Sequence, residues 1–342
     1  MDSLTHIVVG AAIGELTLGK KLGNKAVIVG AIANTIPDLD VFSTKLASTP
    51  EMAMHFHRGY THAFFIHPFM ALPFAYLTYR IFKKEISFIK WYLFFLLGFV
   101  THVLMDGGTA YGTQMFLPFT DKLISWNNLA VVDPLFTLAP LLFFIVVWFI
   151  NKDKDIRRKL AFGSLFLSLF YLGTSTINKF SSASVFKQNL KEKNITVKDF
   201  TSTPTMFTSW LWNMVAYNDT TMYMAEYSVF QKSKEVNIMA IPRNTALLKS
   251  MENSEVIKTD IWFSDGKYYV GQGQGDTLNF YITKWGRADF TQSDPYKMMP
   301  FYGKIYKDAV GNVMSKQVEP DFTKDDFVKY FSMIHHRIFD YK

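Results

Sequence analysis

Residues 91–105 read WYLFFLLGFVTHVLM, and Asp106 follows directly. A run this apolar is typical of a helix inside a bilayer, because a helix satisfies its own backbone polar groups. The run nevertheless contains His102, four residues before Asp106. Residues four apart on a helix share one face. The stretch therefore predicts a membrane helix that presents an imidazole and a carboxylate together.

Other apolar stretches predict the same architecture. Residues 64–82, 129–150 and 160–177 are the strong candidates, and residues 7–19 and 26–37 are shorter and rich in Gly and Ala. We expect the two short stretches to pair as a tight hairpin packed against the others. Together the segments predict a mainly α fold, a polytopic membrane helical bundle of about 4–6 apolar helices.

The composition of the chain changes near residue 180. Residues 1–180 are dominated by apolar side chains, whereas residues 181–342 hold most of the Asn, Asp, Lys, Ser and Thr and no long apolar run. Such a change is typical of a boundary between domains. We therefore expect a membrane-embedded domain over 1–180 and a soluble, β-rich domain over 181–342.

Alternating and turn-forming residues predict the fold of the second domain. Asp265 and Gly266 form a dipeptide typical of a tight turn, so residues 258–273 are expected to be a hairpin. A helix near 323–337 is expected to close a small antiparallel sheet, which makes the domain α+β. The other strands are expected within residues 203–217, 221–230 and 276–290.

Basic residues in the loops predict an orientation in the membrane. Loops rich in Lys and Arg remain in the cytoplasm, which places the domain 181–342 on the extracytoplasmic side. The net charge is +7, but the sequence has no basic stripe with interleaved aromatic residues, so nucleic-acid binding is not expected. The basic loops contain Lys20, Lys21 and Lys25, then Arg80, Lys83, Lys84 and Lys90, then Lys152, Lys154, Arg157, Arg158 and Lys159.

Eight residues suited to binding a metal lie at the ends of the apolar segments. Ionisable groups are costly in a bilayer, so this distribution predicts a site, and the predicted topology places all eight on one face. The chain has no cysteine, so a metal would be held by imidazole and carboxylate groups, which suit Zn²⁺ or, as an alternative, Mn²⁺. The eight residues are His6, Asp38, Asp40, His57, His62, His102, Asp106 and Asp133.

Each of these motifs also has a purely structural interpretation. His102 and Asp106 can form a hydrogen bond inside a helix bundle. Asp38 and Asp40 can cap a helix or lie in a solvated turn, because a proline precedes them. Asp133 also lies beside a proline and can be a helix cap or a ligand.

The segment HRGYTH, residues 57–62, adds a possible substrate contact. His57 and His62 can converge only if the backbone bends between them. Arg58 is expected to hold phosphate or carboxylate oxygens, because its planar guanidinium binds them in bidentate fashion. A metal-bound water near neutral pH would supply the nucleophile. Asp40 or Asp133 would serve as general base if it is not a ligand.

Four motifs in order, MDSLTH, PDLD, HRGYTH and HVLMD, resemble the bacterial membrane-bound metal-dependent hydrolase family, often called YdjM-like. The resemblance covers residues 1 to about 150 and implies an inner-membrane protein with metal-dependent hydrolase activity. A more distant likeness is to zinc-dependent phospholipases C and fungal single-strand nucleases, which use H-x-x-x-D pairs like His102 and Asp106. The chain has one clear pair of this kind and Met1 where those enzymes use a processed Trp, so one or two ions are expected.

The leading hypothesis is a metal-dependent hydrolase of the bacterial inner membrane, with its centre at the extracytoplasmic face. Phosphoester substrates, lipid-linked ones among them, are expected from this location and from the distant likeness. The rival is a non-enzymatic membrane protein, a metal-ion transporter or a scaffold with a structural cluster. A transporter should place its ionisable residues near mid-membrane, so clustering at one face favours the enzyme. The expected ligands are His6, Asp38, His57, His62, His102 and Asp106, and the expected catalytic residues are Asp40, Arg58 and Asp133.

Overall fold

The computed structural model describes residues 1–83, 85–287, 302–318 and 324–339. The chain divides into two compact units, Met1–Thr174 and Ser175–Lys342. The first unit is helical, and the second contains the sheets. One helix begins in the first unit and ends in the second.

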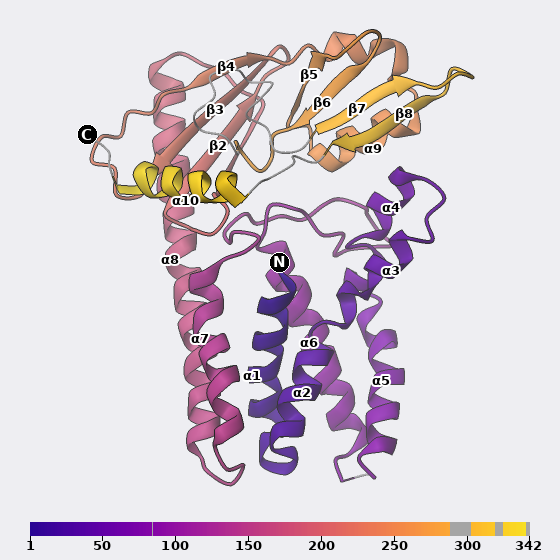
Figure 1. The fold of residues 1–342 in the computed structure, drawn as a ribbon, viewed down its shortest axis with the longest axis vertical. Coiled ribbons are helices and arrows are strands. Elements are labelled where there is room, and N and C mark those ends of the chain that lie inside the picture. The colour runs from indigo at the N-terminus through magenta and orange to yellow at the C-terminus, as the bar shows by residue number, and fades with distance from the viewer. Residues whose placement is uncertain (84, 288–301, 319–323, 340–342) are drawn as a thin grey trace. The chain divides into compact units, whose positions relative to one another are not determined.

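The long helices of the first unit stand side by side and alternate in direction along the chain (Figure 1). The site end of this bundle is where α1, α5 and α7 begin and where α2 and α6 end. The basic end is where α1 ends and where α2, α6 and α8 begin. The helices are α1 Ser3–Leu22, α2 Asn24–Ala33, η1 Ile36–Asp40, α3 Val41–Thr44, α4 Pro50–Phe56, η2 Tyr60–His62, α5 His67–Ile81, α6 Phe88–Gly107, α7 Pro134–Val146, η3 Val147–Phe149 and α8 Ile156–Glu192.

The predicted hairpin of the two short apolar segments is formed by α1 and α2. Gly23 connects the helices with a φ of 54°, a conformation that glycine adopts without strain. A Cβ at Gly14 would lie 2.1 Å from the carbonyl oxygen of Ala26, and one at Gly30 would lie 2.2 Å from that of Gly10. The missing side chains therefore allow the two backbones to touch.

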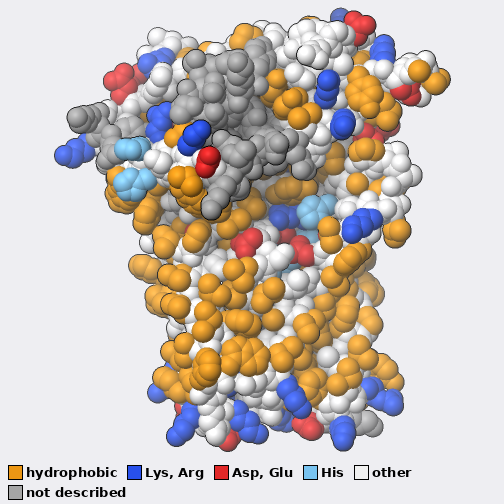
Figure 2. All heavy atoms as spheres, viewed as in Figure 1, with side chains coloured by type: hydrophobic (Ala, Val, Ile, Leu, Met, Phe, Trp, Pro, Cys, Tyr) orange, Lys and Arg blue, Asp and Glu red, His pale blue; other side chains and the backbone are white. Residues whose placement is uncertain are grey.

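Aromatic residues fill the bundle, and apolar residues cover it. Trp91, Phe95 and Phe99 of α6 are buried in the core. Large apolar side chains such as Leu93 and Phe166 are exposed on the outside, and apolar side chains cover much of the bundle surface in Figure 2. Exposed apolar area on this scale is typical of a surface that contacts lipid.

Within the part of the chain that the structure describes, two helices, α6 and α8, are long and apolar enough to cross a membrane. A third candidate is the pair Asn24–Ala33 and Ile36–Thr44, which is bent by 45°. The helices α5 and α7 have 15 and 13 residues, fewer than the roughly 20 that a bilayer requires. The sequence-based count of 4–6 apolar helices as spans, and their orientation, therefore stay predictions.

The described residues of the second unit form two four-stranded antiparallel sheets, in the orders β1-β2-β3-β4 and β5-β6-β7-β8. Each sheet is a meander, because neighbouring strands follow one another along the chain. The strands are β1 Asp199–Pro204, β2 Leu211–Tyr217, β3 Thr221–Ser228, β4 Met239–Pro242, β5 Tyr268–Gln272, β6 Leu278–Ile282, β7 Tyr302–Lys307 and β8 Val313–Val318, and the helices are η4 Thr245–Met251, α9 Glu255–Ser264 and α10 Lys324–Phe339.

The sequence predicted one sheet where the structure has two, and the hairpin over residues 258–273 was wrong. Its first half belongs to α9, where Ile257, Asp260 and Phe263 are buried at helical spacing. Asp265 and Gly266 do turn the chain, with φ values of 51° and 72°, but they connect a helix to β5. The closing helix near 323–337 is confirmed by α10. Residues 288–290 of the last predicted strand lie outside the described residues.

Candidate metal centre

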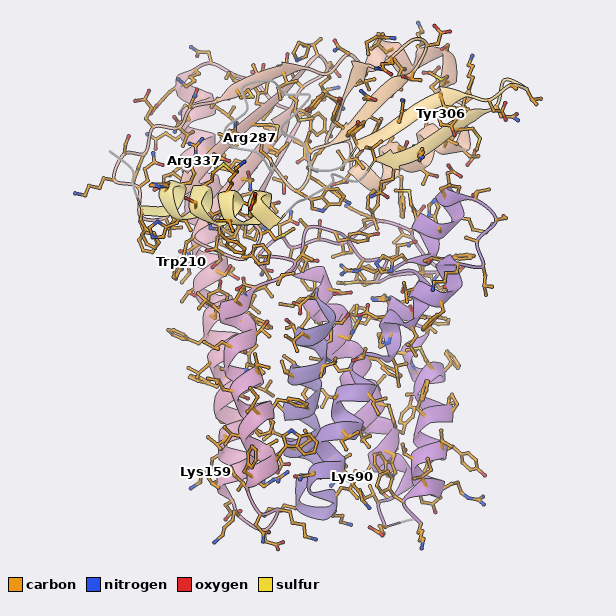
Figure 3. The ribbon with its side chains drawn as sticks, in the orientation of Figure 1. Lys90, Lys159, Trp210, Arg287, Tyr306 and Arg337 are labelled. Carbon is orange, nitrogen blue, oxygen red and sulfur yellow. The ribbon has the colours of Figure 1, made fainter. Side chains whose placement is uncertain are left out.

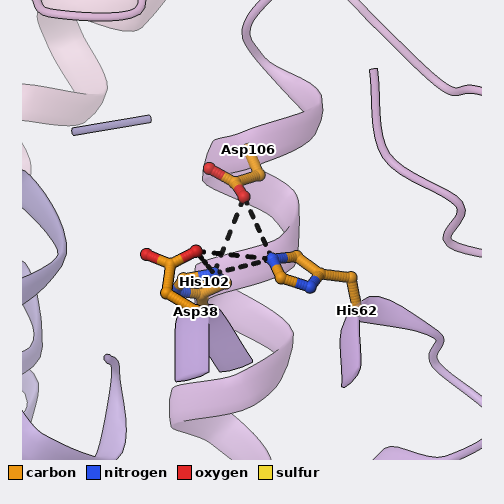
Figure 4. Close-up of side chains that lie close together, drawn as sticks. All are labelled: Asp38, His62, His102 and Asp106. Carbon is orange, nitrogen blue, oxygen red and sulfur yellow. Dashed lines mark hydrogen bonds and ion pairs between the residues drawn. The ribbon is translucent and has the colours of Figure 1, made fainter. Parts of the chain in front are cut away.

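Four ionisable side chains from three segments converge at the site end of the bundle (Figure 4). They are Asp38 of η1, His62 of η2, and His102 and Asp106 of α6. One possible ligand atom from each lies within 4.8 Å of the others. The side chains of His62, His102 and Asp106 are fully buried, and that of Asp38 is 20% exposed.

Local structure explains the convergence. Pro37 occupies the first turn of η1 and cannot continue the hydrogen bonding of α2, so the chain turns sharply and carries Asp38 inward. His62 ends the short helix η2. His102 and Asp106 lie one turn apart on α6, as their spacing predicted.

Five of the six distances between the four candidate ligand atoms are close to those of a tetrahedral metal site, and the ligand atoms of Asp38 and Asp106 lie within 4.8 Å of each other. Nε2 of His62 lies 3.2 Å from Oδ2 of Asp106 and 3.7 Å from Oδ1 of Asp38. Nε2 of His102 lies 3.6 Å and 3.4 Å from the same two oxygens, and the two nitrogens are 3.1 Å apart. Atoms bound tetrahedrally to zinc at about 2.0–2.1 Å lie about 3.3–3.4 Å from one another. The four atoms therefore enclose a position suited to such an ion.

The outer nitrogens of both imidazoles are held by the protein. Nδ1 of His102 donates to the carbonyl oxygen of Asn34 at 2.7 Å. Nδ1 of His62 lies 3.3 Å from Oδ2 of Asp40 and 3.0 Å from Oγ1 of Thr61. With the proton placed on Nδ1, each ring presents the lone pair of Nε2 to the centre, as metal-binding histidines commonly do. Oδ2 of Asp106 lies 3.1 Å from Nε of Arg58 and 3.2 Å from Nε2 of His62, but among the described residues it accepts no hydrogen bond of good geometry.

Asp40 lies behind His62 and contacts the segment that carries it. Its carboxylate accepts hydrogen bonds from the backbone N–H of Arg58 at 2.7 Å and from Oγ1 of Thr61 at 3.2 Å. Nδ1 of His57 lies 3.1 Å away. These contacts connect Asp40 and His57 to the segment around His62, and the catalytic role expected of Asp40 and the metal-binding role expected of His57 stay predictions.

Arg58 balances the charge of Asp106. Its Nε lies 3.1 Å from Oδ2 of Asp106, Nη1 donates to Oγ1 of Thr109 at 3.2 Å, and the guanidinium lies 4.7 Å from the ring centre of Tyr111. The φ of Arg58 is 55°, a value that costs energy in any residue other than glycine. This strained backbone allows its N–H to reach Asp40 while its side chain reaches Asp106.

The electrostatic environment of His62 favours positive charge. Burial opposes protonation, but hydrogen bonds with the carboxylates of Asp106, Asp38 and Asp40 raise the pKa of His62 to about 10. A metal ion at the centre would take the place of such a proton, because a ligating imidazole must be deprotonated.

Two further predicted residues lie outside the four-atom set. His6 stacks on His102 with ring centres 3.8 Å apart, and its Nε2 lies 3.2 Å from Oδ1 of Asp106. The amino group of Met1 donates to the same oxygen. Asp133 is the N-cap of α7, where it accepts from the N–H of Phe136 at 3.4 Å and from Tyr171 at 3.0 Å. Its contacts are those of a helix cap.

Three further residues contact the candidate ligands and Arg58, and none of the motifs pointed to them: Asn34, Thr61 and Thr109. Asn34 accepts the hydrogen bond from His102 through its backbone carbonyl, which every residue possesses. The contact therefore could not be predicted from the type of residue at position 34. Thr61 lies inside HRGYTH and Thr109 lies one turn beyond Asp106, so these two were open to inspection. His67 is also buried, and its Nε2 lies 3.1 Å from the carbonyl oxygen of Thr61.

Comparisons with known proteins agree with the motifs in the first unit. A protein of Bacillus subtilis (strain 168), described as the uncharacterized protein YfhP, is 30% identical over 179 residues, which are 50% of this chain and 51% of the relative. The chain therefore matches about half the length of this curated relative, and no solved structure matches it. The profile of the YdjM inner membrane protein family matches residues 1–181. The chain thus belongs to the YdjM inner membrane protein family.

Proposed function

We propose that Asp38, His62, His102 and Asp106 hold a divalent metal ion of the zinc type and that the protein is a membrane-bound hydrolase. The observation that carries this proposal is the convergence of the four groups: the imidazole nitrogens lie 3.1 to 3.7 Å from each other and from the carboxylate oxygens, all four atoms lie within 4.8 Å of one another, and the outer nitrogen of each imidazole is held by the protein. A bound zinc ion would lower the pKa of a coordinated water and polarise an ester oxygen. Manganese is the alternative metal.

The residues around the centre then have distinct roles. His62, His102 and Asp106 are fully buried and act as permanent ligands. Asp38 is the partly exposed member, so substrate approaches from its side. Asp38 either completes the tetrahedron or releases the ion and accepts the proton of the attacking water.

Arg58 and Asp40 act on either side of these ligands. Arg58 offsets the charge of Asp106 and is the cation nearest to a developing oxyanion. Asp40 keeps the imidazole of His62 in place. It does not act as a general base in this proposal, because its carboxylate already accepts hydrogen bonds from the N–H of Arg58 and from Thr61. Asp133, the other predicted base, remains the cap of α7 in this proposal.

A phosphoester is the proposed substrate, and the extracytoplasmic face is the proposed location. In support, the candidate ligands lie at the site end of the bundle, whereas the Lys and Arg side chains gather at the basic end (Figure 2). The positive-inside rule then assigns the basic end to the cytoplasm. A site at a membrane surface is accessible to lipid-linked substrates.

A structural metal site is the second candidate function. Four protein ligands close a tetrahedron, and closed shells are typical of structural zinc, whereas catalytic zinc keeps one position for water. In this case the ion would join η1, η2 and α6, and the protein would have another activity or serve as a scaffold. The partial exposure of Asp38 favours the enzyme, because that ligand is able to exchange with water.

Metal analysis of the detergent-purified protein tests the proposal. We expect one equivalent of zinc or manganese in the wild type and its loss in the double variant His102→Ala/Asp106→Ala. The variant His335→Ala/His336→Ala is the matched control, because it removes two exposed histidines from α10 and should keep the metal. An absence of metal in the wild type, even after reconstitution with either ion, would refute the metal centre.

Phosphoester hydrolysis distinguishes a catalytic metal centre from a structural one. The metal-loaded protein should hydrolyse members of a panel of aryl and lipid phosphoesters, and Asp38→Asn should lower the rate more than the metal content. If the metal-loaded wild type hydrolyses no phosphoester and Asp38→Asn keeps the metal content of the wild type, the centre is structural.

A further inference from the structure

A pocket of about 400 Å³ lies at the basic end of the bundle, away from the metal centre. Its walls come from three separate stretches: residues 15–20 of α1, Lys90 in the first turn of α6, and residues 152–158 around the start of α8. Figure 3 places Lys90 and Lys159 at this end, and Figure 2 shows Lys and Arg side chains gathered there. The pocket belongs entirely to the first unit.

Positive charge dominates the walls. Five cationic side chains line the pocket, together with three carboxylates. One of the carboxylates, Glu15, is already neutralised, because Arg157 binds its two oxygens at 3.1 and 2.7 Å. Among the described residues, none of the five cations forms an ion pair. The five are Lys20, Lys90, Lys152, Lys154 and Arg158.

Hydrogen bonds of Arg157 hold the stretch of residues 152–158, which lines the pocket at the start of α8. The guanidinium of Arg157 is buried and donates to Oδ1 of Asn24 at 2.8 Å and to the carbonyl oxygens of Val147 and Ile150 at 2.9 and 2.7 Å. These bonds join α1, α2 and the end of η3 to the start of α8. The backbone that carries this part of the pocket is thereby fixed, while the five cationic side chains themselves are exposed.

Membrane topology alone does not explain this arrangement. The positive-inside rule requires basic residues in cytoplasmic loops, but it does not require them to converge around a cavity. Here the cations come from stretches more than 60 residues apart in the chain, such as Lys20, Lys90 and Lys154. The first turn of α8, a helix of 37 residues, adds the positive end of its dipole. The pocket therefore has the properties of an anion site.

We propose that this pocket binds a phosphate group, and that the phosphate belongs to the headgroup of an anionic phospholipid. Basic pockets between helices at the cytoplasmic side of a membrane are suited to such headgroups. The volume of about 400 Å³ leaves room for the glycerol portion beside the phosphate. The inference does not depend on the metal centre or on hydrolase activity, since it uses residues at the other end of the bundle.

Lipid-dependent thermal stability of the full chain in neutral detergent tests the proposal. Phosphatidylglycerol should raise the melting temperature in a saturable manner, whereas phosphatidylcholine at the same concentration should not. The double variant Lys20→Gln/Lys90→Gln should weaken the apparent affinity for phosphatidylglycerol by about thirtyfold, since each lysine near an anionic lipid contributes about 1 kcal/mol. The metal content should not change.

A matched control separates the pocket from topology and from general charge. Lys25→Gln/Lys159→Gln removes the same charge from exposed residues at the same end, outside the pocket lining. It should retain the affinity of the wild type. Equal losses in both variants, or equal stabilisation by phosphatidylcholine, would overturn the proposal.

A parallel titration with inorganic phosphate distinguishes the source of the anion. For a lipid site, phosphate should stabilise the protein weakly and should be displaced by phosphatidylglycerol. If inorganic phosphate instead binds with the same dependence on Lys20 and Lys90 and phosphatidylglycerol has no effect, the site takes a free phosphate and the lipid assignment is wrong.

Discussion

Asp40 lies behind the proposed metal centre and contacts the segment that carries His62, one of the four candidate ligands. The carboxylate holds the segment that carries His62, through the N–H of Arg58 and Oγ1 of Thr61, and it lies against Nδ1 of His62 itself. A carboxylate in this position orients the imidazole and makes it a better ligand.

The variant Asp40→Asn is therefore expected to weaken zinc binding by about 10- to 100-fold, the usual cost of losing such a partner. The amide keeps the size of the carboxylate but loses its charge. Competition with a zinc-chelating dye measures the affinity of the purified protein. Asp219→Asn, an exposed residue of the second unit, serves as the control. An unchanged affinity in Asp40→Asn would show that the carboxylate has no part in orienting His62.

We expect Lys267 to make the thermal stability of the second unit depend on pH in the alkaline range. Its Nζ is nearly buried and lies 2.7 Å from Oδ2 of Asp265 and 2.9 Å from Oδ2 of Asp199. Burial opposes the charged form, but hydrogen bonds with the two carboxylates raise the pKa of Lys267 above its ordinary value. The charged lysine thus stabilises the folded state at pH values below about 10.4, and this contribution is lost as the pH rises through the raised pKa.

The comparison between wild type and Lys267→Met isolates this effect. Below about pH 10 the wild type should melt at the higher temperature, and the difference should shrink as the pH increases further. Melting curves of the full chain in detergent at a series of pH values provide the measurement. A difference that stays constant to pH 11.5 would show that the charge of Lys267 does not contribute.

At the scale of elements, the hairpin of α1 and α2 positions the centre. Its helices touch at Gly10, Gly14 and Gly30. The carbonyl oxygen of Asn34, directly after α2, holds Nδ1 of His102, and the side chain of Asn34 donates to the carbonyl oxygen of His6 at 2.8 Å. A displacement of α2 should therefore reach the metal ligands.

Gly30→Ala is expected to destabilise the protein by about 1–3 kcal/mol, the typical cost of overpacking. Its Cβ would lie 2.2 Å from the carbonyl oxygen of Gly10, so one helix must shift. Thermal melting and zinc content should both decrease. Gly163→Ala in α8 is the matched control, because its Cβ would meet nothing within 4 Å, and it should melt at the wild-type temperature or slightly above. Equal behaviour of the two variants would contradict the close packing of α1 and α2.

The elements differ in how well the sequence predicted them. The helix α6 was predictable because its apolar run is long and because His102 and Asp106 share a face at any helical geometry. The helix α9 was not, since Ile257, Asp260 and Phe263 lie in a short segment whose alternation also suits a strand. Spacing alone could not separate Asp38, which reaches the centre, from Asp40, which lies behind it. That difference arises from the turn at η1 and from tertiary contacts.

At the scale of the whole molecule, the proposed topology follows from the two ends of the helical bundle. The candidate ligands lie at one end and most of the basic loops at the other, so a single orientation assigns both. The chain contains no cysteine, which makes it a ready background for introducing single cysteines as reporters.

Three single-cysteine variants test the orientation. We expect Ser48→Cys, beside α4 at the site end, to react with a membrane-impermeant maleimide in intact spheroplasts. Lys25→Cys, at the basic end, should react only after permeabilisation. Val310→Cys reports on the second unit, where this side chain is 85% exposed, and it should behave as Ser48→Cys does. Labelling of Lys25→Cys but not Ser48→Cys in intact spheroplasts would show that the topology is the reverse of the proposed one. The proposed metal centre would then lie at the cytoplasmic face, and its phosphoester substrates would have to reach it from inside the cell.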